Sequence, residues 1–183
     1  MDKIGNYTIE VSTADYTLNS TDNNPYDLVY LEDAGGICPT FIGLKIYADT
    51  DSLFKSAIIG AQGGSTRVHE TSHILKSDRV VICCSDTVFC LSIPDLYLNW
   101  KTKSDIATCF EIFKYKEDYI IHGELEITRL SNDGKILWQK GGNDIFTPSH
   151  SIAEDFIITE DYILATDWDK RKYKFDFEGN IIS

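Results

Sequence analysis

The residues best suited to chemistry in this sequence are His69, Glu70 and His73, which spell His-Glu-Thr-Ser-His. In zinc hydrolases with this spacing, two histidines one helical turn apart bind the metal while the glutamate activates water. That geometry requires a helix, yet Thr71 and Ser72 are poor helix formers. A hairpin repeat of about 40 residues aligns His69–His73 with Cys109–Phe113, so we expect the motif to lie on a strand. There the two histidines would lie about 13 Å apart, too far to share one ion. We therefore interpret the motif as a chance match, keep His69 and His73 as weak metal candidates, and expect no cofactor.

Five cysteines offer thiols for metal binding or nucleophilic attack: Cys38, Cys83, Cys84, Cys90 and Cys109. Structural zinc sites prefer spaced pairs, whereas adjacent Cys83 and Cys84 would point to opposite faces of a strand. Cys109 with His122 or His150 could form a nucleophile and base, but the spacing does not support that pair. Free thiols in apolar strands behave as small hydrophobes, so we predict buried cysteines and a reducing cytoplasm.

Two acidic clusters are candidates for metal or acid–base chemistry. Asp49-Thr50-Asp51 and Asp167-Trp168-Asp169 lack the glycine and terminal glutamate of an EF-hand loop, and we interpret them as turn acids. A glycosidase-like carboxylate pair stays open, because separation in space decides it. The sequence has no phosphate-binding glycine loop, nucleophile elbow or dinucleotide fingerprint. We predict a protein that is not an enzyme.

The charge balance narrows the choice of partner. The formal net charge is −12, from 29 acidic and 17 basic residues. Binding to nucleic acid or an anionic membrane requires clustered Lys and Arg, so neither partner is expected. No apolar run approaches the roughly 18 residues of a membrane span, and the first residues do not form a signal peptide. The acidity fits either simple solubility or a basic protein partner in the cytoplasm.

Sequence repeats indicate the elements that position these residues. Asn132-Asp133-Gly134 predicts a tight hairpin turn between two apolar strands. Similar hairpins recur around Asp78, Asp118 and Asp161, which are 40 and 43 residues apart, and Trp100 and Trp138 are 38 residues apart. A period near 40 residues with about four strands is typical of a propeller blade. Tryptophans at equivalent positions favour the blade core, with a ligand groove as the alternative.

The fold class predicted from these patterns is all-β. Antiparallel sheets built from propeller-like repeats of about 40 residues would cover 65–183. Strands within 1–64 would complete them in a single domain, 1–183. The strands expected there are 7–11, 26–31, 41–47 and 57–60, with a short helical turn within 48–55.

Two resemblances extend this interpretation. The phrase from Asp133 to Trp138 resembles the repeats of quinoprotein-type β-propellers, and that likeness covers roughly 65–183. The chain as a whole resembles uncharacterised small bacterial proteins, on Ser56–Gly60, Cys83–Leu91 and Ala107–Gly123. Such proteins are often encoded near secreted polymorphic toxins, so this resemblance implies an immunity protein.

The functional hypothesis is a non-enzymatic cytosolic protein that binds and neutralises a basic protein, with a toxin as the candidate partner. Trp168 lies among charges in an apparent turn, and an exposed tryptophan is a good interface anchor. The candidate contact residues are Glu32, Asp33, Glu154, Asp155, Asp167, Trp168 and Asp169. A small-molecule or glycan-binding repeat protein is the alternative, and a zinc hydrolase at His69 and His73 is the third hypothesis.

Overall fold

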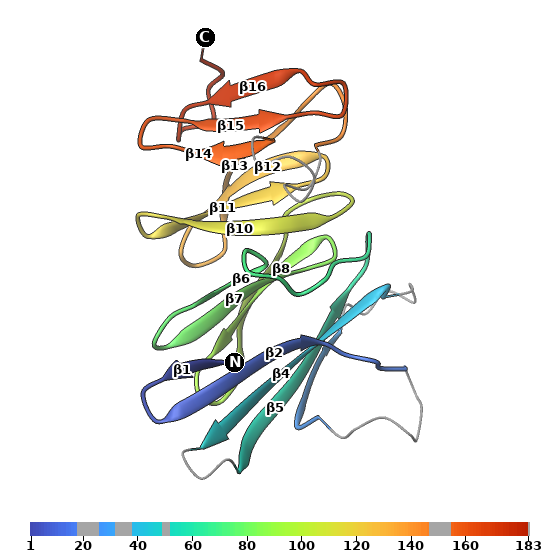
Figure 1. Ribbon diagram of the computed structural model, residues 1–183, viewed down its shortest axis with the longest axis vertical. Helices are drawn as coiled ribbons and strands as arrows, with labels where there is room; N and C mark the ends of the chain where they lie inside the picture. The colour runs from blue at the N-terminus through green and yellow to red at the C-terminus, as the bar shows by residue number, and fades with distance from the viewer. Residues whose placement is uncertain (18–25, 32–37, 49–51, 147–154, 183) are drawn as a thin grey trace.

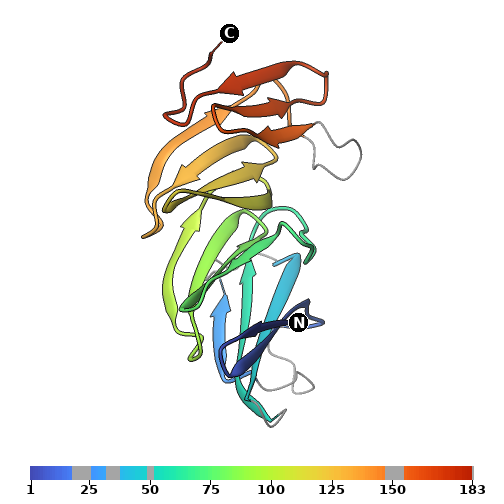
Figure 2. The same ribbon diagram turned by 60° about the vertical axis from the view of Figure 1, so that its left-hand side comes forward.

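A computed structural model describes residues 1–17, 26–31, 38–48, 52–146 and 155–182. Within those ranges the chain has no helix and forms sixteen β-strands in four sheets. The predicted all-β fold is confirmed. The sheets are stacked along the long axis, from the N-terminal sheet at the bottom to the C-terminal sheet at the top (Figure 1), and the turned view keeps the same order (Figure 2).

The first sheet is formed by the N-terminal strands in the order β1-β2-β4-β5-β3. Their bounds are β1 Asp2–Ile4, β2 Tyr7–Thr13, β3 Leu28–Leu31, β4 Thr40–Ala48 and β5 Leu53–Ala61. The edge strand β3 runs parallel to β5, whereas the other pairs are antiparallel. The helical turn expected within 48–55 is wrong for the described part of that stretch. Tyr47 pairs with Leu53, so β5 begins there and continues the ladder.

The other three sheets are antiparallel meanders. The second sheet contains β6 His73–Leu75, β7 Arg79–Cys84, β8 Thr87–Ser92 and β9 Leu98–Lys103. The third contains β10 Cys109–Tyr115, β11 Asp118–Gly123, β12 Glu126–Leu130 and β13 Ile136–Gly141. The fourth contains β14 Phe156–Ile158, β15 Ile163–Thr166 and β16 Lys172–Phe175. The repeated hairpins of the sequence therefore correspond to successive blade-like sheets.

Strands at the centre of the stack are buried on both faces. Side chains alternate along a strand, so Val80 and Ile82 of β7 face the first sheet while Val81 and Cys83 face the third. A third core cluster joins the third sheet to the fourth, around Phe156 and neighbouring aromatic residues. Three apolar layers thus alternate with four sheets and hold the stack together.

The sheets are also joined by contacts between an edge-strand aromatic residue and a turn of the following sheet. A Cβ on Gly134 would overlap the Trp100 indole, and one on Gly179 would lie 2.7 Å from Cδ2 of Trp138. Both glycines have positive φ, +81° and +82°, a conformation that favours glycine. The turn therefore lies flat against the ring. We call each such contact a junction.

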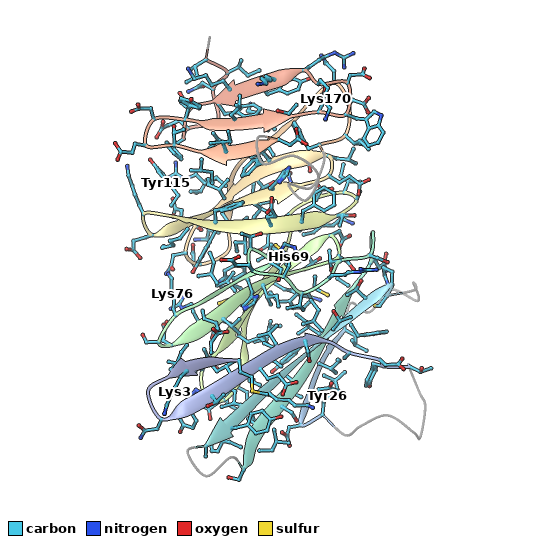
Figure 3. The ribbon with its side chains drawn as sticks, viewed as in Figure 1. Lys3, Tyr26, His69, Lys76, Tyr115 and Lys170 are labelled. Carbon is cyan, nitrogen blue, oxygen red and sulfur yellow. The ribbon has the colours of Figure 1, made fainter. Side chains whose placement is uncertain are left out.

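Because the strands alternate in direction, the loops gather at two ends of the stack. One end, the crossover face, contains the β5–β6 and β9–β10 connections, residues 142–146 after β13, and the β7–β8, β11–β12 and β15–β16 turns. The other end, the hairpin face, contains the β1–β2, β6–β7, β8–β9, β10–β11, β12–β13 and β14–β15 turns. In Figure 3 Lys170 marks the crossover face at the right, whereas Lys76 and Tyr115 lie on the left, toward the hairpin face.

Candidate partner-binding face

Backbone hydrogen bonds tie the loops of the crossover face to one another. The Asp86 amide donates to the Gln62 carbonyl at 3.0 Å, which joins the β7–β8 turn to the preceding connection. The Phe146 amide donates to the Glu124 carbonyl at 2.6 Å, and the Trp168 amide donates to the Ile145 carbonyl at 2.8 Å. These loops therefore belong to one bonded framework, which holds the backbone of each residue that protrudes from them in place.

The β15–β16 turn is built around the buried carboxylate of Asp167. This carboxylate accepts hydrogen bonds from the Arg171 amide at 2.8 Å and the Tyr173 hydroxyl at 2.9 Å, and it pairs with the Arg171 guanidinium at 3.3 Å. Burial raises the pKa of Asp167, but these hydrogen bonds and the Arg171 charge outweigh it and leave the pKa below its ordinary value. The charged carboxylate therefore holds the turn closed.

Trp168 projects from this turn into solvent. Its side chain is 65% exposed, although tryptophan is usually well buried. Its backbone amide is bonded to the Ile145 carbonyl, so the turn conformation is fixed while most of the residue is exposed to solvent. Beside it, exposed Asp169 pairs with the Arg171 guanidinium at 2.7 Å. This arrangement presents a large apolar ring with charged groups at its side.

The structure brings together only part of the predicted contact set. Trp168 and Asp169 are exposed, as an interface requires. Asp155 and Asp167 are 4% and 0% exposed, so their carboxylates support the loops and do not fit the predicted role of direct contacts. Each of these two carboxylates can be buried because a cation lies near it: Lys170 lies 3.8 Å from Asp155, and Arg171 pairs with Asp167. Glu32, Asp33 and Glu154 lie outside the described residues.

Ile106 is a second apolar residue on the crossover face, and sequence reasoning missed it. Its side chain is 67% exposed in the β9–β10 connection. The preceding Asp105 is buried and accepts hydrogen bonds from the amides of Ala107 at 2.6 Å and of Leu125 at 2.9 Å, among others. Burial raises the pKa of Asp105. The one signal in the sequence was an isolated isoleucine between Asp105 and Ala107, a pattern too common to be specific.

The His69–His73 motif forms a turn followed by the first residue of a strand. Only His73 lies on β6, so the expectation that all five residues lie on a strand is wrong. The wrong alignment came from turn lengths, because His73 pairs with Ile82 and is equivalent to Glu111, not to Phe113. Hydrogen bonds between His69 and Ser72 form this turn.

Both ring nitrogens of His69 already have protein partners. Nε2 lies 3.1 Å from the Phe110 carbonyl, and Nδ1 lies 3.2 Å from the Thr71 hydroxyl. That hydroxyl donates to Glu111 at 2.7 Å, and Glu111 pairs with buried His122 at 2.9 Å. This network joins the second and third sheets. Within the described ranges, no group of three or more His, Cys, Asp or Glu residues is placed to hold a metal ion.

The five cysteines are buried free thiols. Burial raises the pKa of Cys84 to about 12 and raises that of Cys109 well above its ordinary value. A thiol with a raised pKa carries little of the reactive thiolate at neutral pH. His122, the proposed base for Cys109, is paired with Glu111, and His150 lies outside the described residues.

Comparison with known proteins supports the architecture alone. No protein-family model and no curated protein matches the chain. The computationally designed Ika8 protein matches with a TM-score of 0.53 and 11% identity, over 79% of this chain and 45% of that one. The AfRom2 CNH domain matches with a TM-score of 0.47 and 13% identity, over 78% of this chain and 46% of that one. The chain thus spans about half the length of these solved structures. In the described part of the chain, no helix is long and apolar enough to cross a membrane.

Proposed function

We propose that this chain is a non-enzymatic cytoplasmic binding protein that takes a basic protein partner on its crossover face. Trp168 is the anchor and Asp169 the adjacent charge. The observation that carries the proposal is the exposure of Trp168 on a turn that buried Asp167 holds in one conformation.

The energetics of interfaces support this role for Trp168. Tryptophan is enriched among residues that dominate binding energy, and such residues work best when their position is fixed before binding. Ile106 supplies a second exposed apolar side chain on the same bonded framework. The net charge of −12 would attract a basic partner and raise its association rate at low salt.

The finer proposal is that the partner is a toxin and that binding neutralises it. A nuclease toxin would have to approach phosphate, so it would be basic and complementary to this acidic chain. Neutralisation would be steric, with the chain covering the surface through which the toxin reaches its substrate.

Co-expression with the product of the neighbouring gene tests this proposal. We expect that product to stop growth when expressed alone and the wild-type chain to restore growth. Asp169→Lys should weaken the rescue, whereas Glu160→Lys, the same reversal at an exposed position on the hairpin face, should preserve it. Absence of rescue by the wild-type chain, together with no binding between the purified proteins, would contradict the proposal.

A small-molecule or glycan ligand is the second candidate function. A pocket of about 410 Å³ lies beside the first sheet, where Tyr16 and Phe41 pack with ring centroids 5.2 Å apart near Arg67. Aromatic rings and a cation can hold a sugar or an anionic ring compound. A glycan array and ligand-dependent melting shifts test this alternative, which Tyr16→Ala should impair and Trp168→Ala should leave unchanged.

A further inference from the structure

Two lysines from different sheets bring their ammonium groups to the same buried tyrosine. Lys76 follows β6 in the second sheet, and Lys114 lies on β10 in the third. Their Nζ atoms lie 5.1 and 5.0 Å from the centroid of the Tyr119 ring. Tyr119 is fully buried in the core cluster between these sheets. Lys76 is labelled at the left edge of this boundary in Figure 3.

The acidic groups near these lysines do not balance both charges. Lys76 Nζ donates to the Asn132 side-chain oxygen at 3.4 Å, a neutral acceptor. Lys114 lies 3.7 Å from Glu117, whose side chain is 87% exposed and whose attraction is weakened by solvent. Asp118 is occupied by Arg129, which donates to it at 2.9 and 2.6 Å.

The two ammonium groups also repel each other. Burial and the adjacent Lys76 lower the pKa of Lys114, so the cost of the pair falls on this lysine. Burial also opposes the charge of Lys76, but the Tyr119 side chain helps to raise the pKa of Lys76 above its ordinary value. Packing of the aliphatic stems over Tyr119 accounts for the cover of the ring. Attraction of each cation to the ring face favours these positions, but it does not cancel the repulsion between the two ammonium groups. A bound anion would remove the repulsion.

We propose that Lys76 and Lys114 form a binding site for a phosphate group at the boundary between the second and third sheets. A phosphate carries a charge of about −1.5 to −2 at pH 7, which matches two ammonium groups. Lysine binds phosphate as a point charge with three donors, so two lysines converging from separate sheets can contact separate oxygens. This site lies toward the hairpin face and would bind an anion, whereas the crossover face is proposed to bind a basic protein.

The test compares thermal melting of the full chain in sodium phosphate and in sodium chloride at equal ionic strength and pH 7. Binding to the folded state alone should raise Tm by roughly 2–5 °C when phosphate reaches ten times its Kd. The double variant Lys76→Gln, Lys114→Gln should lose this rise. Lys101→Gln, Lys140→Gln, which removes the same charge from exposed positions on β9 and β13, should keep it.

Further arms of the experiment identify the ligand. Glycerol 3-phosphate in place of inorganic phosphate distinguishes a phosphate monoester from free phosphate, and a rise with either one supports the site. An equal rise with acetate would overturn the assignment to phosphate.

A titration of the wild-type chain with inorganic phosphate, followed by NMR, needs no variant. It should shift the amide signals of Lys76, Lys114 and Asn132 before others. Equal melting in phosphate and chloride, or a rise that survives in the Lys76→Gln, Lys114→Gln variant, would overturn the proposal.

Discussion

The three tryptophans of this chain divide between two environments. Trp100 and Trp138 lie on the edge strands β9 and β13, and each packs against a turn glycine of the following sheet. Trp168 lies on the β15–β16 turn with 65% of its side chain exposed. The same residue type therefore joins sheets at two positions and is mostly exposed to solvent at the third.

The first sheet shows that a junction does not require tryptophan. Tyr30 on β3 occupies the corresponding place, and its hydroxyl donates to the Leu96 carbonyl and accepts from the Leu98 amide, each at 3.2 Å. Leu96 takes the place of the turn glycine at φ +57° and is fully buried. A junction thus needs an aromatic edge residue and a tight turn, whereas Trp168 has no such partner. The junctions therefore stabilise the stack, whereas Trp168 is the residue that we propose for partner binding.

The largest expected effect comes from filling a junction. Gly134→Val places a β-branched residue at φ +81° and overlaps the Trp100 ring, so we expect a loss of about 3 kcal/mol or more in the free energy of unfolding. Gly5→Val is the matched control, because Gly5 has φ +55° with no atom within 4 Å of the added Cβ. Urea unfolding measures both. Equal losses would show that backbone strain alone, and not the junction, sets the cost.

The two junction tryptophans should differ from each other. Trp138 Nε1 donates to the Phe177 carbonyl at 2.8 Å, whereas buried Trp100 Nε1 has no hydrogen-bond partner among the described residues. Trp138→Phe should therefore cost about 1 kcal/mol more than Trp100→Phe in urea unfolding. A larger loss for Trp100→Phe would refute this account of the two junctions.

The tyrosine junction should depend on its hydroxyl. Tyr30→Phe keeps the ring but leaves the Leu96 carbonyl and the Leu98 amide without this partner, and we expect a loss of about 1 kcal/mol. The measurement is again the urea midpoint. An unchanged midpoint would mean that ring packing alone maintains the contact between the first and second sheets.

The smallest expected effect is a pH dependence at the boundary of the first and second sheets. Burial lowers the pKa of His73 below its ordinary 6.5, partly offset by Asp2. The unfolded chain then binds more protons than the folded chain as the pH falls through 6.5, so this contribution is present above that pH and lost below it. The urea midpoint should fall more from pH 7.5 to 5.5 in the wild type than in His73→Gln. Equal falls of the urea midpoint in the two proteins would contradict this pH dependence.

The repeat architecture could be predicted because hairpin chemistry is local. The Asp-Gly turn before Trp138 and the turn acids Asp78, Asp118 and Asp161 fix the register of the sheets without tertiary information. The junction between Tyr30 and Leu96 could not be predicted. Leu96 has a positive φ, a backbone conformation that is maintained by burial in the surrounding structure.

The candidate binding face was only partly predictable for a related reason. Asp167 and Asp169 flank the same tryptophan and have the same side chain, yet one is sealed by Arg171 and Tyr173 and the other is exposed. Burial depends on residues that approach from β16 and the neighbouring connections, and sequence spacing does not contain that information.

Trp168→Ala tests the central claim most directly. We would measure its Tm and its Kd for the purified product of the neighbouring gene beside those of the wild type. We predict a change in stability within about 0.5 kcal/mol, because the side chain is exposed, and a weakening of binding by roughly 30-fold or more. Unchanged affinity with unchanged stability would contradict the claim that Trp168 is the anchor of a binding face.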